Sequence, residues 1–388
     1  MKYRSLSLLL ATLTLSLLSC STRPGEEALN AALKPVKEHH APDTRVAVFT
    51  VTPVWEGNVL VAKGNVDNQQ ARIDALDALR SAAKQEVVDS IEVLPDPALG
   101  DKRYGIVMVS VANVRTRPGQ SAELANQLLM GMVVNILKER HGWYYTQSHD
   151  RYLGWVEESS LNVTDRSGIE QWADAKKVIV TDYFGVVRSQ PNRTSLPVTD
   201  VVEGVLLKRS GSRGSWMGVE LPDGRTGYLE SGLVQDYASW RHSRRLTPDN
   251  VEKTAKLFVG VPYLWGGTSA KGFDCSGYTK TVFRLNGLEL NRDANQQATQ
   301  GEDVPAGPDF SGLRKGDLLF FGRKATADKP ERIWHVGIYL GHELFIHCAG
   351  RVRINSFDPS APNFDPDRLK TFVRARRIIG ISQIPEIG

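Results

Sequence analysis

The stretch Gly272-Phe273-Asp274-Cys275-Ser276-Gly277-Tyr278 decides how the rest of this chain is interpreted. Apolar residues recur at helical spacing after it, up to Leu285, which predicts a helix from Cys275 onward with Asp274 as its N-cap. Backbone N–H groups and the helix dipole at that end favour an anion, which would make the Cys275 thiol easier to ionise. Many free cysteines are instead small buried hydrophobic residues, so this stretch alone leaves a nucleophile and a buried thiol equally open.

The composition is that of an ordinary globular protein, with 388 residues of which 41% are hydrophobic and 24% are charged. This length allows about two to four domains. The formal net charge is only +4 and no nucleic-acid-binding motif is present, so we expect no nucleic-acid partner. We also expect no cofactor, no metal site and a monomer, and we interpret the adjacent His39 and His40 as solvated surface residues.

The N-terminal residues have the pattern of an export signal. Lys2 and Arg4 precede an apolar run, Leu6 to Leu18, which is too short for a typical membrane span and is followed by Ser19-Cys20. The segment resembles a bacterial lipoprotein signal with Cys20 as the lipidation site, and an ordinary secretory signal is the alternative. Each buried CH₂ of an acyl chain contributes about 0.8 kcal/mol, so several chains would anchor the protein to a membrane. The predicted location is therefore the periplasmic or other extracytoplasmic side of the bacterial cell envelope.

Cysteine usage leaves two thiols inside the folded chain. Of the three cysteines, removal of Cys20 leaves Cys275 and Cys348. Two cysteines in an exported protein do not make a disulfide scaffold. A bridge between them stays open on counting alone, although it would abolish thiol chemistry. Cys348 has the parity of an apolar strand face and is predicted to lie in the core.

Turn signals and changes of composition divide the chain into segments. In order they are a signal peptide (1–19), a tether (20–42), a small α/β module (43–97), two segments of short strands (98–166 and 174–238) and the segment that contains Cys275 (245–388). The α/β module is predicted to have the order strand, strand, helix, strand, with its first strand over residues 45–51. We assign no chemistry to this module.

Short motifs in the two strand-rich segments resemble bacterial SH3-like domains. The first segment has Asn113-Val114-Arg115-Thr116-Arg117-Pro118, Gly142-Trp143-Tyr144 and Tyr152-Leu153-Gly154-Trp155-Val156, and the second has the divergent counterparts Val186-Val187-Arg188-Ser189-Gln190-Pro191, Gly214-Ser215-Trp216 and Gly224-Arg225-Thr226-Gly227-Tyr228-Leu229. The resemblance implies two small β barrels that bind or position a substrate. Generic small barrels with structural aromatic residues are the alternative.

Two histidines are placed to serve a cysteine nucleophile, which needs a base and a group that orients the base. His335 and His347 lie on two predicted strands, 334–340 and 344–348. A three-residue turn over 340–342 would collect the apolar residues of both strands on one face and pair the two histidines on the other. Directly opposite residues have Cβ atoms about 4.5–5.5 Å apart, so His347 could hydrogen-bond to His335 and orient it. Two satisfied surface histidines are the alternative.

Several motifs together then resemble the NlpC-type cell-wall cysteine peptidases, which have a papain-like fold. They are Pro262-Tyr263-Leu264-Trp265-Gly266-Gly267, the stretch around Cys275, Arg314-Lys315-Gly316-Asp317-Leu318-Leu319-Phe320-Phe321, His335-Val336-Gly337-Ile338-Tyr339 and Phe345-Ile346-His347. The resemblance implies a multidomain protein with a papain-like α+β peptidase domain, preceded by two small SH3-like β barrels and a small α/β N-terminal module. It also implies that Cys275 is the nucleophile, His335 the base and His347 the third, polar member, with the Cys275 backbone N–H in an oxyanion hole.

Two SH3-like domains before the peptidase are similar to a narrower subgroup, the YkfC-like γ-D-glutamyl-L-diamino acid endopeptidases. This resemblance implies cleavage of the murein stem peptide between D-Glu and the diamino acid, with a free N-terminal L-Ala. The implied pocket residues are Asp274, Ser276, Tyr263 and Trp265, together with Tyr152 and Glu123 from the first SH3-like domain. A desolvated ammonium needs paired carboxylates, which suits Asp274 and Glu123. Arg292 is the candidate for the D-Glu α-carboxylate, although Ala294 stands where the subgroup often has serine.

Three other functions remain open at this stage. The enzyme could cut cross-links or stem peptides in intact wall, it could be a related acyltransferase or amidase, or the chain could be a non-catalytic wall-binding lipoprotein. Residues 322–333 are charged and are predicted to form a solvated surface loop near the pocket.

Overall fold

The computed structural model describes residues 23–381. The predicted signal peptide and Cys20 lie outside these residues. None of the helices within residues 23–381 is long and apolar enough to cross a membrane. The chain separates into two compact units, and the short piece Asp43–Val48 belongs to the unit that contains everything from Leu94 onward.

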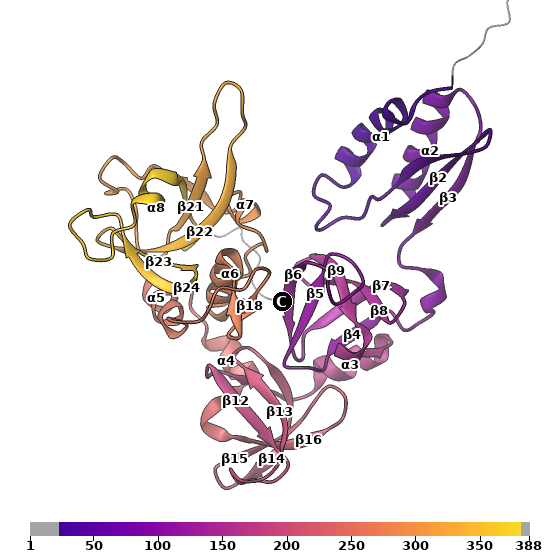
Figure 1. Cartoon of the computed structure of the whole chain (residues 1–388). Helices are drawn as coiled ribbons and strands as arrows, with labels where there is room; N and C mark the ends of the chain where they lie inside the picture. The colour runs from indigo at the N-terminus through magenta and orange to yellow at the C-terminus, as the bar shows by residue number, and fades with distance from the viewer. Residues whose placement is uncertain (1–22, 382–388) are drawn as a thin grey trace, which may run out of the picture. The chain divides into compact units, whose positions relative to one another are not determined.

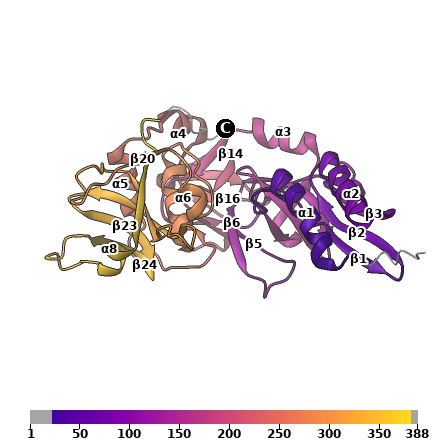
Figure 2. The ribbon, with the colours of Figure 1, turned by 90° about the horizontal axis from the view of Figure 1, so that it is seen from above.

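The other unit is a small α/β structure, drawn in indigo in Figure 1. Its elements are α1 (Glu26–His40), β1 (Thr52–Glu56), β2 (Val59–Val66), α2 (Gln69–Ala83) and β3 (Val87–Val93). The sheet order is β1-β2-β3, and β2 and β3 are parallel because α2 crosses over between them. Both helices pack on the sheet (Figure 2).

Two expectations for this part of the chain need correction. The first strand begins at Thr52 and not at residue 45, because Asp43–Val48 packs in the other unit. The segment expected to be a tether contains the helix α1, which buries Leu29 and Leu33.

Two seven-stranded barrels follow, and their strands are connected in the same way. The first has the order β10-β4-β7-β8-β9-β5-β6, and the second has β17-β11-β14-β15-β16-β12-β13 when its strands are taken from the equivalent edge. The strands of the first are β4 (Tyr104–Val107), β5 (Val111–Arg115), β6 (Leu124–Leu129), β7 (Val133–Arg140), β8 (Trp143–Ser148), β9 (Leu153–Glu157) and β10 (Leu161–Thr164), and α3 (Arg166–Asp174) follows. Those of the second are β11 (Lys177–Val180), β12 (Phe184–Arg188), β13 (Pro197–Val202), β14 (Leu206–Arg213), β15 (Trp216–Glu220), β16 (Thr226–Glu230) and β17 (Val234–Asp236).

One glycine in each barrel explains the repeated motif of the closing strand. A Cβ atom at Gly154 would lie 2.3 Å from Cγ1 of Val114, and a Cβ atom at Gly227 would lie 2.5 Å from Cγ1 of Val187. In both barrels the closing strand therefore approaches the opening strand so closely that only glycine fits.

The C-terminal part packs helix α6 against an antiparallel sheet with the order β20-β25-β21-β22-β23-β24. Its elements are α4 (Tyr237–Ser243), α5 (Pro248–Leu257), β18 (Thr268–Ser269), β19 (Gly272–Phe273), α6 (Cys275–Leu285), α7 (Ala294–Gln297), β20 (Glu302–Val304), β21 (Leu318–Arg323), β22 (Arg332–Gly341), β23 (Leu344–Ala349), β24 (Arg351–Ser356), α8 (Pro366–Thr371) and β25 (Phe372–Arg377). Helix α6 is buried at nearly every position, with Tyr278 and Phe283 packed against Val336 and Ile338 of the sheet. A separate aromatic cluster around Phe321 and Phe345 fills the other face.

The predicted register of β22 and β23 is wrong by two residues. The turn consists of His342 and Glu343, which both have positive φ as a tight two-residue hairpin turn requires, and Leu340 forms a bulge. Ile338 consequently pairs with Ile346, so His335 and His347 are diagonal neighbours and not direct partners. A shift of two residues keeps both histidines on the same face, which is why their predicted proximity survives the error.

Candidate active site

Helix α6 begins at Cys275 because Asp274 caps it. The Asp274 carboxylate accepts a hydrogen bond from the Gly277 backbone N–H at 2.6 Å. Glycine is required at 277, since a Cβ atom there would lie 2.0 Å from the Gly267 carbonyl oxygen. The cap and this close approach fix Cys275 at the first helical position, where it is only 6% exposed.

The Cys275 thiol faces the strand that carries His335. Its Sγ lies 4.0 Å from the carbonyl oxygen of Trp334, the residue before His335, and it also interacts with the backbone N–H of Val336, the residue after it. Cys275 and Cys348 are both free, so the bridge that counting left open is absent from residues 23–381. Cys348 is fully buried, with Sγ 3.2 Å from the Phe273 carbonyl oxygen, as expected for a core residue.

Burial governs the protonation of the cysteine and the histidine. It raises the pKa of the Cys275 thiol to about 12, with a further increase from the Asp274 charge, against the opposing effect of the Val336 N–H. Burial lowers the pKa of His335 well below its usual range, and the nearby His347 and Arg368 lower it further. Burial therefore disfavours both the thiolate of Cys275 and the imidazolium of His335, and it favours the neutral thiol and the neutral imidazole.

A chain of hydrogen bonds sets the tautomer of His335. The Asn355 side-chain amide donates to the Asn363 carbonyl oxygen at 3.1 Å, which turns Oδ1 of Asn355 toward Nε2 of His347 at 3.0 Å. His347 must then carry its proton on Nε2, leaving Nδ1 to accept from Nε2 of His335 at 2.7 Å. His335 donates from Nε2, so its Nδ1 is the unprotonated nitrogen and can act as a base. Sequence reasoning missed Asn355. The only sign of its role in the sequence was its position on a strand, which places its side chain on the same face as His347.

A cavity of about 440 Å³ lies beside Cys275. Seven of the predicted site residues line it, namely Cys275, Asp274, Ser276, Tyr263, Trp265, Tyr152 and Glu123. His335, His347 and Arg292 are buried and do not line the cavity. Residues that sequence reasoning did not select also line it, including Arg45, Asp293, Asn295 and Arg332. Asp293 directly follows Arg292, and Arg332 lies in the charged segment 322–333, so both stand beside features that the sequence analysis named. No feature of the sequence around Arg45 pointed to a role at the cavity.

Arg292 differs from the expectation, because it is a buried structural cation. It is 2% exposed, and its guanidinium donates to both carboxylate oxygens of Asp274, with Nη2–Oδ2 at 2.6 Å and Nη1–Oδ1 at 3.1 Å. Its Nε donates to Asn126 at 2.9 Å and its Nη1 to Ser276 at 3.2 Å. Arg292 is therefore engaged inside the protein and has no surface with which to meet a substrate carboxylate.

The first barrel supplies one wall of the cavity. Glu123 accepts a hydrogen bond at 2.8 Å from the indole of Trp265, which is 63% exposed. The Tyr152 hydroxyl donates to Asp293 at 3.1 Å, and both burial and the Asp293 charge raise the pKa of Tyr152. Gln127 of the same barrel bonds to the backbone and side chains of β18. The two domains thus form the cavity jointly.

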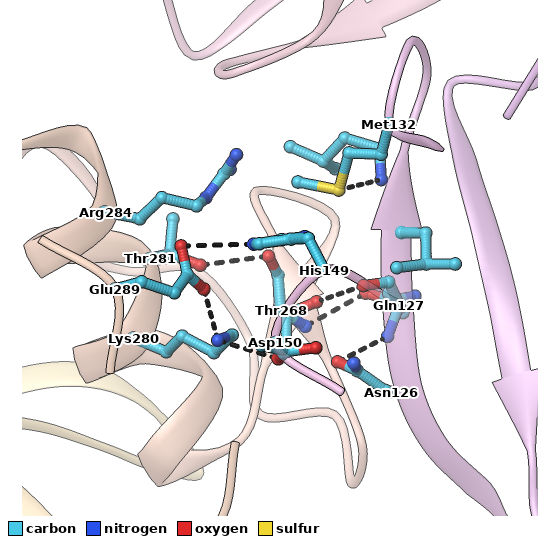
Figure 3. A pocket seen from close by; sticks show the side chains of 12 residues that line it. Asn126, Gln127, Met132, His149, Asp150, Thr268, Lys280, Thr281, Arg284 and Glu289 are labelled. Carbon is cyan, nitrogen blue, oxygen red and sulfur yellow. Dashed lines mark hydrogen bonds and ion pairs between the residues drawn. The ribbon is translucent and has the colours of Figure 1, made fainter. Parts of the chain in front are cut away.

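A buried ionic cluster fixes the barrel to helix α6, as Figure 3 shows. Lys280 of α6 lies between two carboxylates, with Nζ 2.9 Å from Asp150 and in contact with Glu289. Glu289 also pairs with His149 at 3.4 Å. Burial raises the pKa of Glu289, but the Lys280 charge, the hydrogen bond and charge of His149 and the Arg284 charge together outweigh it and bring the pKa down to about 2. The pKa values of Asp150 and Glu289 are both lowered, so both carboxylates are ionised at neutral pH, and the cluster links the barrel to the helix that begins at Cys275.

Comparison with known proteins agrees with this architecture. The sequence model of the NlpC/P60 family matches residues 260–365, and that of the bacterial dipeptidyl-peptidase Sh3 domain matches residues 114–161. A protein named dipeptidyl-peptidase 6 from Lysinibacillus sphaericus is 30% identical over 278 residues, which cover 69% of this chain and 96% of that protein. This chain belongs to the NlpC/P60 family of cysteine peptidases.

Two further proteins resemble this chain beyond its NlpC/P60 domain, one by sequence and one by structure. A Bacillus cereus protein named γ-D-glutamyl-L-lysine dipeptidyl-peptidase is 29% identical over 270 residues, or 66% of this chain and 76% of that protein. The crystal structure of an NlpC/P60 family protein from Bacillus cereus superposes with a TM-score of 0.60 at 24% identity, covering 71% of this chain and 99% of that one. The fold is therefore multidomain, with β-rich domains before a papain-like NlpC/P60 domain.

Proposed function

We propose that this NlpC/P60 protein is a peptidoglycan hydrolase that cuts the bond between γ-D-Glu and the diamino acid in murein stem peptides with a free N-terminal L-Ala. The observation that carries the proposal is the joint cavity, where Glu123 and Tyr152 of the first barrel face Cys275 of the peptidase domain. The names of the relatives from Lysinibacillus sphaericus and Bacillus cereus support a dipeptidyl-peptidase.

The proposed reaction starts with His335 protonated on Nε2 and unprotonated on Nδ1. Cys275 transfers its proton to Nδ1 of His335, and the thiolate attacks the γ-carbonyl carbon of D-Glu. The backbone N–H of Cys275 stabilises the developing oxyanion at the start of α6. His335 then protonates the amine of the diamino acid, the C–N bond breaks, and water hydrolyses the acyl-enzyme. His347 holds His335 in the tautomer that can accept the first proton.

Selection for a free amine is assigned to Glu123 and Tyr152. The Glu123 carboxylate makes a hydrogen bond only to Trp265 among the described residues, which leaves one oxygen for an ammonium. The Tyr152 oxygen can accept from the same ammonium while its hydroxyl donates to Asp293. Asp274 also lines the cavity, but both of its oxygens already accept from Arg292 and from backbone N–H groups. We therefore give Asp274 the role of holding Cys275 and Arg292 in place.

Mass spectrometry of the products formed from L-Ala-γ-D-Glu-diamino acid and its N-acetylated form tests this function. Wild type should release L-Ala-D-Glu from the free peptide only, and Cys275→Ala should release none. Glu123→Gln should lower kcat/KM for the free peptide. It should also reduce the ratio of kcat/KM for the free peptide to kcat/KM for the acetylated peptide. Equal cleavage of both peptides, or of intact sacculi, would rule out the selection for a free amine. Cleavage by Cys275→Ala would refute the nucleophile.

We also propose that the protein is anchored to a membrane through a lipid on Cys20, on the extracytoplasmic side of the cell envelope. The support is the sequence of the first 20 residues. Cells fed radiolabelled palmitate should label the wild-type protein, and Cys20→Ala should remain unlabelled and leave the membrane fraction. Labelling of the Cys20→Ala variant would contradict this proposal.

A further inference from the structure

The charges that line the cavity are mostly neutralised within the protein. Arg45 makes a double hydrogen bond to Asp43, with Nε–Oδ1 at 2.8 Å and Nη2–Oδ2 at 2.7 Å, and its Nη1 donates to Asp293 at 2.8 Å. Arg292 neutralises Asp274 from behind the cavity wall. These pairs leave two lining side chains without an ionic partner among residues 23–381, the anion Glu123 and the cation Arg332.

Arg332 is held at the cavity by the strand that carries His335. The charged segment expected to be a loop over 322–333 is shorter than expected, because β21 continues to Arg323 and β22 begins at Arg332. Arg332 is exposed and makes no side-chain hydrogen bond or ion pair within the described part of the chain. It lies directly opposite Arg323, and like charges at paired positions are unfavourable. A bound anion would relieve that repulsion.

The position of Arg332 relative to the thiol brings its guanidinium within reach of the scissile bond. The Trp334 carbonyl oxygen is 4.0 Å from Cys275 Sγ. Arg332 and Trp334 are two residues apart on β22, where the pairing with β21 shifts by one residue, so their backbones are at most about 7 Å apart, which is comparable to the length of an arginine side chain. Arg332 can therefore reach groups on the substrate that flank the carbonyl carbon attacked by Cys275.

We propose that Arg332 binds a substrate carboxylate next to the scissile bond. The cavity is then complementary to a peptide that carries an ammonium at one end, at Glu123, and a carboxylate beside the scissile bond, at Arg332. The planar guanidinium suits a carboxylate because it can donate two parallel hydrogen bonds. This inference rests on the proposed function, in whose substrate three carboxylates flank the bond: the D-Glu α-carboxylate, the C-terminal carboxylate, and the side-chain carboxylate of diaminopimelate when that is the diamino acid.

The test compares Arg332→Gln with Arg323→Gln, which removes the same charge from the opposite strand of the hairpin. Arg323 donates to the Pro330 carbonyl oxygen at 3.2 Å and does not line the cavity. Four peptides serve as probes: L-Ala-γ-D-Glu-diaminopimelate, its form with D-isoglutamine in place of D-Glu, its C-terminal amide, and the form with L-Lys in place of diaminopimelate. Affinities are measured on the full chain carrying Cys275→Ala, and kcat/KM on the active enzyme.

Arg332→Gln should weaken binding of the parent peptide and lower its kcat/KM on the order of tenfold to a hundredfold, whereas Arg323→Gln should change both less than about threefold. One modified peptide should already bind weakly to the protein that retains Arg332, and Arg332→Gln should not weaken its binding further. The carboxylate that this peptide lacks is then the one that Arg332 binds. An equal loss on all four peptides, or equal effects of the two variants, would overturn the role of Arg332. Binding of the parent peptide without cleavage by wild type would instead overturn the proposed function while leaving Arg332 to be judged from the affinities.

Discussion

The hydrogen-bond chain behind Cys275 predicts that Asn355 controls the reactivity of His335. We consider Asn355→Leu, which has similar volume and no acceptor, beside Asn355→Asp, which keeps an acceptor for His347. In Asn355→Leu the Nε2–H group of His347 loses its partner in a site where His347 is fully buried. His347 would then gain by moving its proton to Nδ1, where it would point at His335 and reverse the direction of the hydrogen bond.

The magnitude follows from the lost hydrogen bond. A buried polar group left unpaired costs about 1–3 kcal/mol, which corresponds to roughly 5-fold to 150-fold in the preference between the two tautomers. We therefore expect Asn355→Leu to lower kcat by roughly 5-fold to 150-fold with little change in KM, and Asn355→Asp to stay within about threefold of wild type. The assay is the pH profile of peptide cleavage, with ¹⁵N NMR of labelled histidine to read the tautomer of His335 directly.

The control separates positioning from folding. Urea unfolding should show both variants folded at the assay temperature, so that the difference in kcat is not a difference in folded protein. Wild-type kcat in Asn355→Leu, or an Nε2-protonated His335 unchanged in its spectrum, would refute the argument that Asn355 fixes the tautomer.

Three further predictions concern stability and are measured by urea unfolding. Arg292→Gln leaves the Asp274 carboxylate buried without its cation and should lower the free energy of unfolding by about 3–5 kcal/mol, whereas Lys256→Gln, which breaks an exposed pair with Glu252, should change it by less than about 1 kcal/mol; equal effects would contradict the burial of Arg292. Burial lowers the pKa of His347 from 6.5 to about 4, so between these values the unfolded chain binds a proton that the folded chain does not, and stability should fall as the pH drops through that window. His347→Gln should flatten this slope, and an unchanged slope would assign it to other groups. Gly154→Ala should destabilise the first barrel by about 1–3 kcal/mol because its Cβ would lie 2.3 Å from Val114, while Gly232→Ala, which meets nothing within 4 Å, should be tolerated; similar losses in both would count against the close-approach argument.

Local patterns were sufficient for the parts of the site that depend on one element. The helix after Asp274 follows from its cap residue and its apolar spacing, and both are properties of consecutive residues. The two histidines were placed on one face because side chains alternate along a strand, and this parity survives a shift of two residues. The repeated motifs of the barrels follow from close backbone approaches that only glycine allows, at Gly154 and Gly227.

The rest depended on contacts between residues far apart in the chain. The register of β22 and β23 was set by the positive φ angles of His342 and Glu343. Neither residue is a glycine, the residue type that most readily adopts positive φ, so the sequence did not indicate this turn. Arg292 was expected at the substrate, but the fold buries it against Asp274, and burial cannot be read from a charged residue in isolation. Arg45 reaches the cavity from a piece of chain almost 250 residues before Asp293, its partner there.

The sequence by itself determined that a cysteine begins a helix and that two histidines share a strand face, because caps and periodicities act over a few residues. Only the tertiary structure decided which charges around Cys275 are already neutralised and which remain for a ligand. Charge pairing depends on distance and desolvation, and both arise only when the folded chain brings Arg45 to Asp293 and Arg292 to Asp274 and leaves Arg332 at the cavity without a carboxylate partner among the described residues.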